Sequence, residues 1–353
     1  MKKIIIHPSP VLVDTEVFIG ENILTENLLK GFCKDLKVVI IADVALKDLY
    51  GLKLAKSLRA ELLTIPSGER FKTKETQEQV MGELFKMGAG RDTVLIALGG
   101  GVITDLVGFI SSIYMRGIPL ILIPTTLLAM VDAAIGGKTA IDTPFGKNLI
   151  GTIYHPKAIF ISLDLLKTLP EKEWFNGFAE ILKMGLIRDS HLCELFKKNK
   201  KDPELIVRSM KGKIEIVQQD LTEQSMRRIL NFGHTIGHGL ETIAAYEMPH
   251  GEAVAIGCLV ESYLSMHLGY LPKEIFEQIQ ELYKEFSLEL PKTYERESLL
   301  KALFYDKKKE NGLLRFILIN RIGHAISFEG SFCRPVTLNE LESSLNWMEN
   351  TYG

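Results

Sequence analysis

The sequence contains few cysteines and almost no net charge, and both absences restrict the class of protein. The four cysteines among its 353 residues are scattered and form no CxxC pair: Cys33, Cys193, Cys258 and Cys333. This spacing argues against a zinc ribbon and a disulfide framework, and it favours a reduced, cytoplasmic setting. The formal net charge of -2 gives no general electrostatic reason to expect nucleic acid or an anionic membrane as a partner. Any anion binding must therefore be local.

A long apolar run is also missing. The opening residues, MKKIIIHPSP, hold three consecutive isoleucines, which is too short for the apolar region of a signal peptide. The longest apolar stretch, IPLILIPTTLLAMV, is interrupted by Pro124, Thr125 and Thr126 and falls short of a membrane span. Hydrophobic residues at 46% and charged residues at 24% instead describe a soluble globular protein, long enough for two domains.

Residues 37–165 alternate short apolar runs with amphipathic stretches. The runs predict strands at KVVIIAD, ELLTIP, DTVLIALGGG, IPLILIPTT and KAIFISLD. The stretches between them predict helices at roughly 44–59, 73–88 and 101–114. Strands that are apolar throughout and separated by helices indicate a parallel sheet buried on both faces, whose ligands bind at the carboxyl ends of the strands.

From about residue 170 the pattern becomes helical. One strand pair is predicted in LLRFILINRIGHAISF, with a turn near Arg321 and Gly323, and the last helix has a capping-box start from Thr337 to Glu340. We therefore expect a Rossmann-like α/β domain over residues 1–168 and a mainly α-helical domain over residues 169–353. Such an arrangement predicts a site in the cleft between the two domains.

Three glycines in LIALGGGVITDLVGF end a predicted strand directly before a helix that contains Asp105. Glycines in this position let backbone amides approach a phosphate or pyrophosphate, and the helix N-terminus adds partial positive charge. Thr104 excludes the GxGxxG pattern, and a tight turn without a ligand is the alternative.

A second glycine segment, IGGKTAID, ends in Gly-Lys-Thr, but Asp132 stands where the P-loop pattern needs its first glycine. The nucleotide-triphosphatase interpretation is therefore rejected. What remains in VDAAIGGKTAIDTPFGKN is a polar loop with Lys138, Lys147 and Asn148. Its lysines are either solvated surface or a clamp for an anion.

Three of the eight histidines lie in NFGHTIGHGLETIAAYEMPHGEAVAIG. His234 and His238 are four residues apart, which places both imidazoles on one face of a helix, and His250 opens a second apolar helix after a Met-Pro break. Thr235 follows His234, which excludes the HExxH protease motif. The histidines either bind a metal or are structural, and a metal would need a carboxylate from elsewhere.

FAEILKMG offers that carboxylate, because Glu180 lies three residues before Lys183 among apolar neighbours that predict at least partial burial. The alternative is an exposed ion pair. A buried carboxylate needs a cation or a metal, and one carboxylate with two histidines is the three-ligand arrangement of catalytic zinc. Arg227 and Asn231 extend the face of His234 and His238 if the helix is continuous through Gly233, which would suit a metal and an anionic, hydroxylated ligand.

With these motifs in place, the sequence resembles the 3-dehydroquinate synthase family, which performs the second step of the shikimate pathway. The matching segments run in order from residue 67 to 308: SGERFKTKET, GGGVITDLVGF, YMRG, PTTLLAMVDAAIGGKTAIDTPFGKNLIG, LKTLP, GFAEILK, MRRILNFGHTIGHGLE, PHGEAVAIG and DKK. They cover most of the chain, and together they are highly specific.

The resemblance implies an N-terminal NAD-binding domain, a C-terminal helical metal domain and a homodimer. Glu180, His234 and His250 would hold a divalent metal, zinc or cobalt, while His238 would face the substrate. The cofactor-binding residues implied are Asp43, Ser67, Gly68, Glu69, Lys72, Gly100, Gly101, Asp105, Thr125, Thr126, Lys138, Lys147, Leu165 and Thr168. The substrate-binding residues implied are Arg116, which tends to reach the neighbouring subunit in this family, Asp132, Lys138, Asn148, Lys213, Arg227, Asn231, His238 and Lys307. The catalytic residues implied are Lys183, Lys213, Glu223 and His238.

The family's substrate is 3-deoxy-D-arabino-heptulosonate 7-phosphate, a sugar acid with one carboxylate and one phosphate. The resemblance implies transient oxidation by NAD beside the metal, elimination of phosphate, return of the hydride, ring opening and an intramolecular aldol closure. NAD is regenerated in each turn. The two anionic ends of the substrate explain why the site would need several arginines and lysines.

Three residues depart from the family pattern. Ala45 stands where the family often has asparagine in the dinucleotide pocket, Leu221 replaces the usual glutamate after Asp220, and Asp142 stands near a position that is usually asparagine. These departures concern cofactor affinity more than the reaction.

Three other functions are weighed against this one. A related cyclase that makes a valiolone or deoxyinosose precursor would share the metal ligands but alter the substrate contacts. A metal-dependent alcohol or glycerol dehydrogenase would consume NAD stoichiometrically and would not need so many cations. A structural zinc protein that senses dinucleotide fits poorly with three metal ligands.

Overall fold

The computed structural model describes residues 14–221, 223–307 and 314–353, and it divides into two compact units. The first unit comprises Met1–Pro124 and Gly137–Ser162, and the second comprises Thr125–Gly136 and Leu163–Gly353. The segment 125–136 thus belongs to the second unit, although it lies within the range 1–168 that the sequence predicts for the first domain. Within the described residues, no helix is both long enough and apolar enough to cross a membrane.

A six-stranded parallel sheet organises the first unit, with the strand order β1-β8-β5-β4-β2-β3. Its strands are β1 (Glu16–Gly20), β2 (Lys37–Asp43), β3 (Glu61–Ile65), β4 (Thr93–Gly99), β5 (Leu120–Pro124) and β8 (Ala158–Ser162). Every residue of β4, β5 and β8 is buried, because these strands lie inside the sheet and carry apolar side chains on both faces. This confirms the predicted parallel sheet.

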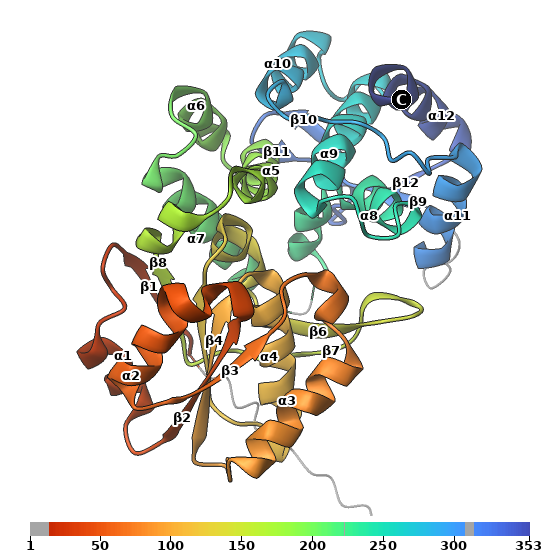
Figure 1. Cartoon of the computed structure of the whole chain (residues 1–353). Coiled ribbons are helices and arrows are strands. Elements are labelled where there is room, and N and C mark those ends of the chain that lie inside the picture. The colour runs from red at the N-terminus through yellow and green to blue at the C-terminus, as the bar shows by residue number, and fades with distance from the viewer. Residues whose placement is uncertain (1–13, 222, 308–313) are drawn as a thin grey trace, which may run out of the picture. The chain divides into compact units, whose positions relative to one another are not determined.

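Helices cover both faces of this sheet. They are α1 (Glu26–Cys33), α2 (Leu52–Leu58), α3 (Lys74–Lys86) and α4 (Gly101–Ile113), with short helical turns η1 (Val44–Leu46), η2 (Lys47–Gly51), η3 (Glu69–Phe71) and η4 (Tyr114–Arg116). Figure 1 shows α1 and α2 on one face and α3 and α4 on the other. From β1 to β3 the chain moves across the sheet in one direction, and from β3 to β5 it moves back in the other. Because each crossover between parallel strands is right-handed, the helices of the two directions lie on opposite faces.

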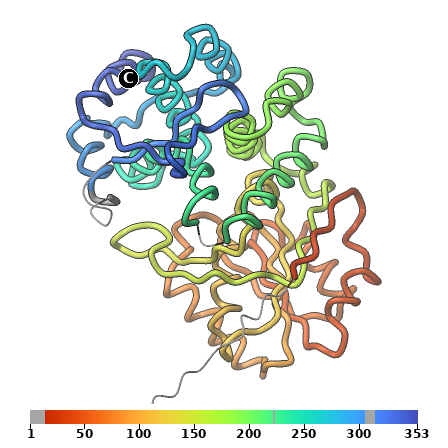
Figure 2. The backbone as a smooth tube through the Cα atoms, turned by 180° about the vertical axis from the view of Figure 1, so that it is seen from behind, coloured from red at the N-terminus to blue at the C-terminus, as the bar shows by residue number. Residues whose placement is uncertain are grey.

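Two parts of the first unit differ from the sequence expectation. The edge strand β1 is not among the predicted strands, and the segment expected to be a polar loop contains an antiparallel hairpin, β6 (Lys138–Thr143) and β7 (Gly146–Ile153). Both lack the continuous apolar pattern of an internal strand, because β1 lies at the sheet edge and β7 is mostly exposed. In Figure 2 the turn of this hairpin reaches out from the rest of the first unit.

The second unit is mainly helical, as predicted. Its helices are α5 (Glu171–Ile187), α6 (Ser190–Lys198), α7 (Pro203–Gln219), α8 (His234–Ile243), α9 (His250–His267), α10 (Lys273–Tyr283), α11 (Arg296–Lys307) and α12 (Leu338–Tyr352), with helical turns η5 (Ala129–Ala133), η6 (Leu163–Thr168) and η7 (Met226–Asn231). Two small antiparallel pairs join β9 (Leu314–Phe316) to β12 (Arg334–Val336) and β10 (Ile319–Arg321) to β11 (His324–Ala325). The predicted turn near Arg321 and Gly323 and the capping box of Thr337 and Glu340 are both present.

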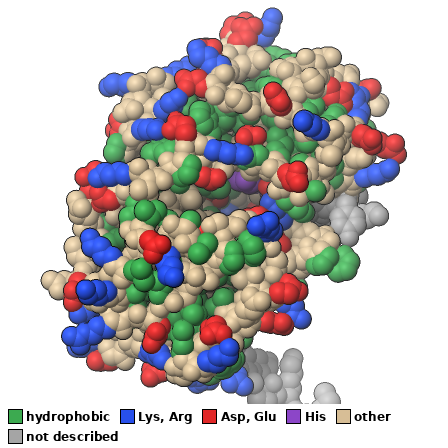
Figure 3. Space-filling view, viewed as in Figure 1, with side chains coloured by type: hydrophobic (Ala, Val, Ile, Leu, Met, Phe, Trp, Pro, Cys, Tyr) green, Lys and Arg blue, Asp and Glu red, His purple; other side chains and the backbone are tan. Residues whose placement is uncertain are grey.

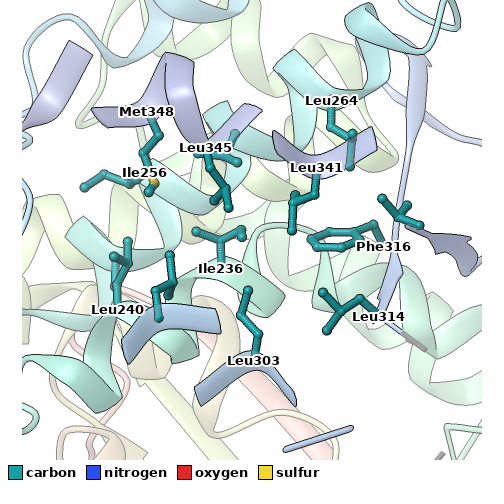
Figure 4. Close-up of a cluster of buried hydrophobic side chains, with 14 of the residues drawn as sticks. Ile236, Leu240, Ile256, Leu264, Leu303, Leu314, Phe316, Leu341, Leu345 and Met348 are labelled. Atoms are coloured by element: carbon teal, nitrogen blue, oxygen red, sulfur yellow. The ribbon is translucent and has the colours of Figure 1, made fainter. Parts of the chain in front are cut away.

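A hydrophobic core holds α8 and α9 in place. Ile236 and Leu240 of α8 and Ile256 of α9 pack with Leu303 and Phe316 in a fully buried cluster (Figure 4). Because these residues anchor one face of α8, its histidine face points away from the core.

The surface agrees with the small net charge. Basic and acidic side chains are mixed over the face seen in Figure 3, with no large area of one sign. That face offers no strong general field for a polyanion.

Candidate metal centre and its surroundings

Three helices of the second unit bring one carboxylate and two imidazoles together. One ligand atom from each of Glu180 on α5, His234 on α8 and His250 on α9 lies within 4.8 Å of the others. Glu180 Oε1 lies 3.5 Å from Nε2 of His234 and 3.5 Å from Nε2 of His250. These distances are longer than an ordinary hydrogen bond, and within the described part of the chain Oε1 is buried with no hydrogen-bond partner.

The donor set fits a zinc-like ion. Bonds of roughly 2.0–2.2 Å from nitrogen and oxygen donors in tetrahedral geometry separate neighbouring ligand atoms by about 3.3–3.6 Å. The two 3.5 Å separations around Glu180 Oε1 agree with that spacing. Three protein ligands also leave a coordination position for substrate.

Glu180 is supplied by the buried middle of α5. Its side chain and that of Lys183 are each 2% exposed and form an ion pair one turn apart, so the expected burial of this face is confirmed. Burial alone would raise the pKa of Glu180, but Lys183 and His250 lower it to about 2. The carboxylate is therefore ionised and able to bind a cation.

His234 is the first residue of α8, and it follows a break in the chain. The turn η7 ends at Asn231 and Gly233 adopts φ +78°, so the continuous helix that would align Arg227, Asn231, His234 and His238 does not form. The condition for that alignment is therefore not met. The chain passes so close to α9 here that a Cβ on Gly233 would lie 2.5 Å from Cys258 Sγ.

His250 opens α9 directly after Pro249, as the Met-Pro break predicts. The start of α9 is fixed to α5, because Gly251 N donates a hydrogen bond of 3.0 Å to Asn176 Oδ1. A Cβ on Gly251 would lie 2.5 Å from Asn176 Cα, so the two backbones are in direct contact. This contact with α5 places His250, at the start of α9, beside Glu180 of α5.

The two ligand histidines have opposite electrostatic surroundings. Burial lowers the pKa of His234 well below its usual value, and Lys183 adds to this effect. Burial would also lower the pKa of His250, but contacts with Glu180 and Glu241 raise it to about 10. A metal must therefore displace the proton on His250, whereas His234 is already neutral.

His238 lies beside the ligand group without belonging to it. Its ring centroid is 5.1 Å from that of His234 and 6.4 Å from that of His250. Its assignment to the substrate stays a prediction.

Several of the cations and polar residues predicted for the substrate also lie in the second unit. Lys213 is buried and donates to Asp132 at Oδ1 (2.6 Å) and at the backbone oxygen (2.7 Å), and burial lowers its pKa. Asn231 Nδ2 donates to Glu223 Oε1 at 2.6 Å. Glu223 itself has φ +61°, an unusual conformation for this residue type.

Arg227 is 2% exposed, although its guanidinium is charged. It donates to the backbone oxygens of Leu221 (2.9 Å) and Gly136 (3.2 Å), and within the described residues its Nε has no hydrogen-bond partner. A buried cation whose hydrogen bonds go to neutral carbonyls favours an anionic ligand.

Predicted cofactor residues gather around Lys72 in the first unit. Lys72 is 3% exposed and donates to Asp105 Oδ2 and Asn148 Oδ1, each at 2.6 Å. Asn148, which is predicted to bind the substrate, has φ +57°. Lys147 Nζ lies 3.8 Å from Glu69 Oε1.

The ends of β2 and β4 hold further predicted cofactor residues. Asp43 Oδ1 accepts hydrogen bonds from Ser67 Oγ and from Ala45 N, the latter at 2.9 Å. Gly100 precedes α4 and provides no side-chain cap, so the first amides of α4, from Gly101 onward, keep their partial positive charge.

The remaining predicted residues are distributed over both units. Gly68, Arg116 and Lys138 belong to the first unit, and Arg116 has φ +68° at the end of η4. The second unit contains Thr125, Thr126, Leu165 and Thr168. Lys307 ends α11, and its side chain lies outside the described part of the structure.

The three departures from the family pattern have defined contacts. Ala45 and Leu221 each use a backbone atom, Ala45 N toward Asp43 and Leu221 O toward Arg227. Asp142 Oδ1 accepts from Asn148 N at 2.9 Å. The substitutions at 45 and 221 therefore leave these particular contacts available, because any residue supplies the same backbone atom.

One buried charged residue beside the metal centre is absent from the sequence prediction. Glu241 is 3% exposed on α8, and its Oε2 lies 3.5 Å from His250 Nδ1. The signal in the sequence is its position seven residues after His234, which places both on one helix face.

Comparison with solved structures shows which proteins share this fold. The chain is similar to the 2-epi-5-epi-valiolone synthase of Streptomyces hygroscopicus subsp. jinggangensis, solved with NAD+ and Zn2+, with a TM-score of 0.88, 29% identity, and 98% and 99% of the two chains covered. The iron-containing alcohol dehydrogenase of Thermococcus thioreducens has the same fold at a TM-score of 0.63 and 17% identity, with 96% of this chain and 99% of that chain covered. The fold is therefore that of a class that includes this synthase and this dehydrogenase.

Sequence comparison is more specific. Residues 62–176 match the family model described as 3-dehydroquinate synthase N-terminal, and residues 177–309 match the one described as 3-dehydroquinate synthase C-terminal. The 3-dehydroquinate synthase of Thermodesulfovibrio yellowstonii is 42% identical over 329 residues, covering 88% of this chain and 90% of that protein. That of Helicobacter pylori strain G27 is 45% identical over 322 residues, covering 87% and 90%. The chain belongs to the 3-dehydroquinate synthase family.

Proposed function

We propose that this protein converts 3-deoxy-D-arabino-heptulosonate 7-phosphate to 3-dehydroquinate and phosphate, as a phosphorus-oxygen lyase that depends on NAD and a divalent metal. The observation that supports it best is the buried group of Glu180, His234 and His250 in a chain of this family. When bound there, zinc or cobalt supplies a Lewis acid that polarises a substrate hydroxyl and favours its oxidation.

The cations of the second unit suit the two anionic ends of this substrate. Arg227 presents a buried guanidinium that donates hydrogen bonds to the neutral backbone oxygens of Leu221 and Gly136, and Lys213 presents an ammonium whose pKa burial lowers. In the proposed reaction, Arg227 binds an anionic group of the substrate, while Lys183 and Lys213 orient its oxygens. His238, Lys183, Lys213 and Glu223 are the proposed residues for proton transfer and orientation.

The first unit has the features that a dinucleotide needs. The uncapped N-terminus of α4 provides amides for a pyrophosphate, and Asp43 at the end of β2 provides a carboxylate for a ribose. NAD bound there would accept a hydride from the substrate and return it later in the same turn. Lys72 would hold Asp105 and Asn148 in place beside it.

The proposed function predicts a distinctive stoichiometry. Metal-loaded protein is incubated with the heptulosonate phosphate and a trace of NAD, and both phosphate and reduced cofactor are followed. Phosphate release should far exceed the amount of NAD, with no net NADH, because the hydride returns in each turn. Chelation should stop phosphate release, and added zinc or cobalt should restore it.

Three outcomes would assign the protein differently. Accumulation of NADH in proportion to product would indicate a dehydrogenase such as those that share this fold. Release of phosphate from a different sugar phosphate, with none from the heptulosonate phosphate, would indicate another cyclase. A protein that binds metal and dinucleotide without turnover of either substrate would support the sensor interpretation.

We further propose that the protein is a cytoplasmic homodimer and that the β6–β7 hairpin takes part in the subunit contact. Four apolar side chains of this hairpin are strongly exposed: Phe145 (77%), Leu149 (52%), Ile150 (49%) and Ile153 (52%). Neighbouring exposed apolar side chains on a two-stranded hairpin are typical of a surface that another chain covers.

Phe145→Asp should therefore shift the protein from dimer to monomer, because the contact would have to bury a charge. Light scattering coupled to size-exclusion chromatography measures the mass directly. Leu338→Asp is the matched control, since Leu338 is an exposed leucine at the start of α12 where an acid is tolerated. A Phe145→Asp protein that stays dimeric would exclude the hairpin from the contact, and a monomeric parent protein would exclude the dimer itself.

A further inference from the structure

In each ligand histidine, the two ring nitrogens face different groups. Nε2 of His234 and Nε2 of His250 both lie 3.5 Å from Glu180 Oε1. On the other side of the rings, His234 Nδ1 lies 3.1 Å from the backbone oxygen of Phe232, and His250 Nδ1 lies 3.5 Å from Glu241 Oε2. Both outer partners are acceptors, so each favours the ring form with the proton on Nδ1 and a lone pair on Nε2.

The two outer partners differ in charge. The backbone oxygen of Phe232 is neutral and belongs to the break before α8, whereas Glu241 is an acid with a side chain only 4% exposed. A buried carboxylate is costly unless a cationic or strongly donating group faces it, and His250 is such a group. His234, His238 and Glu241 follow one another at intervals of four and three residues, so the histidine face of α8 also carries this acid toward the start of α9.

We infer that Glu241 is a positioning residue of the metal centre, which holds the His250 imidazole so that its Nε2 faces Glu180 and adds negative charge behind the ligand. This inference rests on the proposed function, because it needs a metal at Glu180, His234 and His250. Glu241 touches no substrate or cofactor in this assignment and acts through His250. Carboxylates behind a ligating histidine fix the ring and increase its basicity toward the metal.

Glu241 also attracts a proton on His250, and a metal at Nε2 must compete with that proton. The attraction of Glu241 for the metal and its attraction for the competing proton have opposite effects on metal affinity, and the larger charge determines which effect is stronger. A divalent ion at Nε2 carries twice the charge of a proton, so at equal distance the carboxylate attracts the metal more strongly than the proton. Removing the charge of Glu241 should therefore weaken metal binding.

The test compares the parent protein, Glu241→Gln and Glu252→Gln. Glutamine keeps the size of the side chain and an acceptor oxygen but removes the charge. Glu252→Gln is the matched control, because it removes a carboxylate from the same turn of α9 as His250 and lies outside the ligand group. Zinc affinity is measured by competition with a chromophoric chelator, and the visible absorption of the cobalt form reports the coordination geometry.

We expect Glu241→Gln to bind zinc roughly 10- to 100-fold more weakly and to change the cobalt spectrum, while Glu252→Gln keeps both. A purely structural role would lower the melting temperature of the metal-free protein and leave the zinc affinity and the cobalt spectrum unchanged, which would overturn the inference. If Glu241→Gln does not fold, Glu241→Asp takes its place, because it withdraws the carboxylate from His250. Weaker zinc binding by Glu241→Asp supports the inference, and parental affinity overturns it.

The same data separate this inference from the proposed metal centre. If the parent protein binds zinc and the Glu241 variants bind it equally well, only the role of Glu241 is wrong. If the parent protein binds neither zinc nor cobalt, the metal centre and the role of Glu241 are overturned together.

Discussion

Replacing His250 by alanine is expected to abolish metal binding and turnover together. His250 Nε2 is one of three atoms in the ligand group, and without it Glu180 and His234 remain as two donors in a buried site. The loss should exceed the roughly 10- to 100-fold that removal of an outer carboxylate costs, because a direct ligand is lost. Zinc content after equilibrium dialysis and phosphate release from the same sample measure the two effects.

His238→Ala should give the opposite combination, with metal retained and turnover lost. The His238 ring lies next to that of His234, but its nitrogen is not part of the ligand group. A residue that transfers a proton in the reaction contributes roughly 10²- to 10⁴-fold to the rate. His191→Ala is the control, since His191 is exposed on α6 and pairs with Glu194. A His238→Ala protein without zinc would show that the ligands are wrongly assigned.

The sheet of the first unit could be predicted because its internal strands are buried on both faces. Each such strand is a continuous apolar run, as in KVVIIAD for β2. Such a run can be recognised in the sequence without knowing which strands lie beside it. The edge strand β1 and the exposed strand β7 have no such run. β1 pairs with β8, which is distant in the sequence, and β7 pairs with β6 across a turn; periodicity alone reveals neither pairing.

The ligand set could be predicted only in part from the residues themselves. The spacing of His234 and His238 indicates a shared helix face, but it does not distinguish the histidine that meets Glu180 from the one beside it. That distinction depends on contacts between α5, α8 and α9, above all the hydrogen bond from Gly251 to Asn176. The resemblance to the family supplied the choice of His250, and the structure brings this residue to Glu180.

The broken helix before His234 shows the same limit. Arg227, Asn231, His234 and His238 would line one face if a single helix ran through Gly233, and a glycine within a helix normally costs about 1 kcal/mol without ending it. The chain nevertheless breaks at Gly233, because its carbonyl lies against Gly257 of α9. A Cβ on Gly257 would lie 1.9 Å from Gly233 O, so no side chain fits between the two backbones.

Gly257→Ala is therefore expected to destabilise the second unit by about 3 kcal/mol or more, at the upper end of what overpacking costs, because the obstructing atoms belong to backbone. It should also weaken zinc binding, since separating α8 from α9 moves His234 away from His250. The two tryptophans of the chain, Trp174 on α5 and Trp347 on α12, both lie in the second unit, so their fluorescence in a urea titration follows that unit alone.

Gly212→Ala on α7 is the matched control. Its Cβ would meet only the flexible Met184 side chain, at 3.3 Å, and the gain in helix propensity is roughly 0.5–1 kcal/mol. Equal midpoints for the two variants would mean that the close approach of α8 and α9 does not hold the metal ligands together.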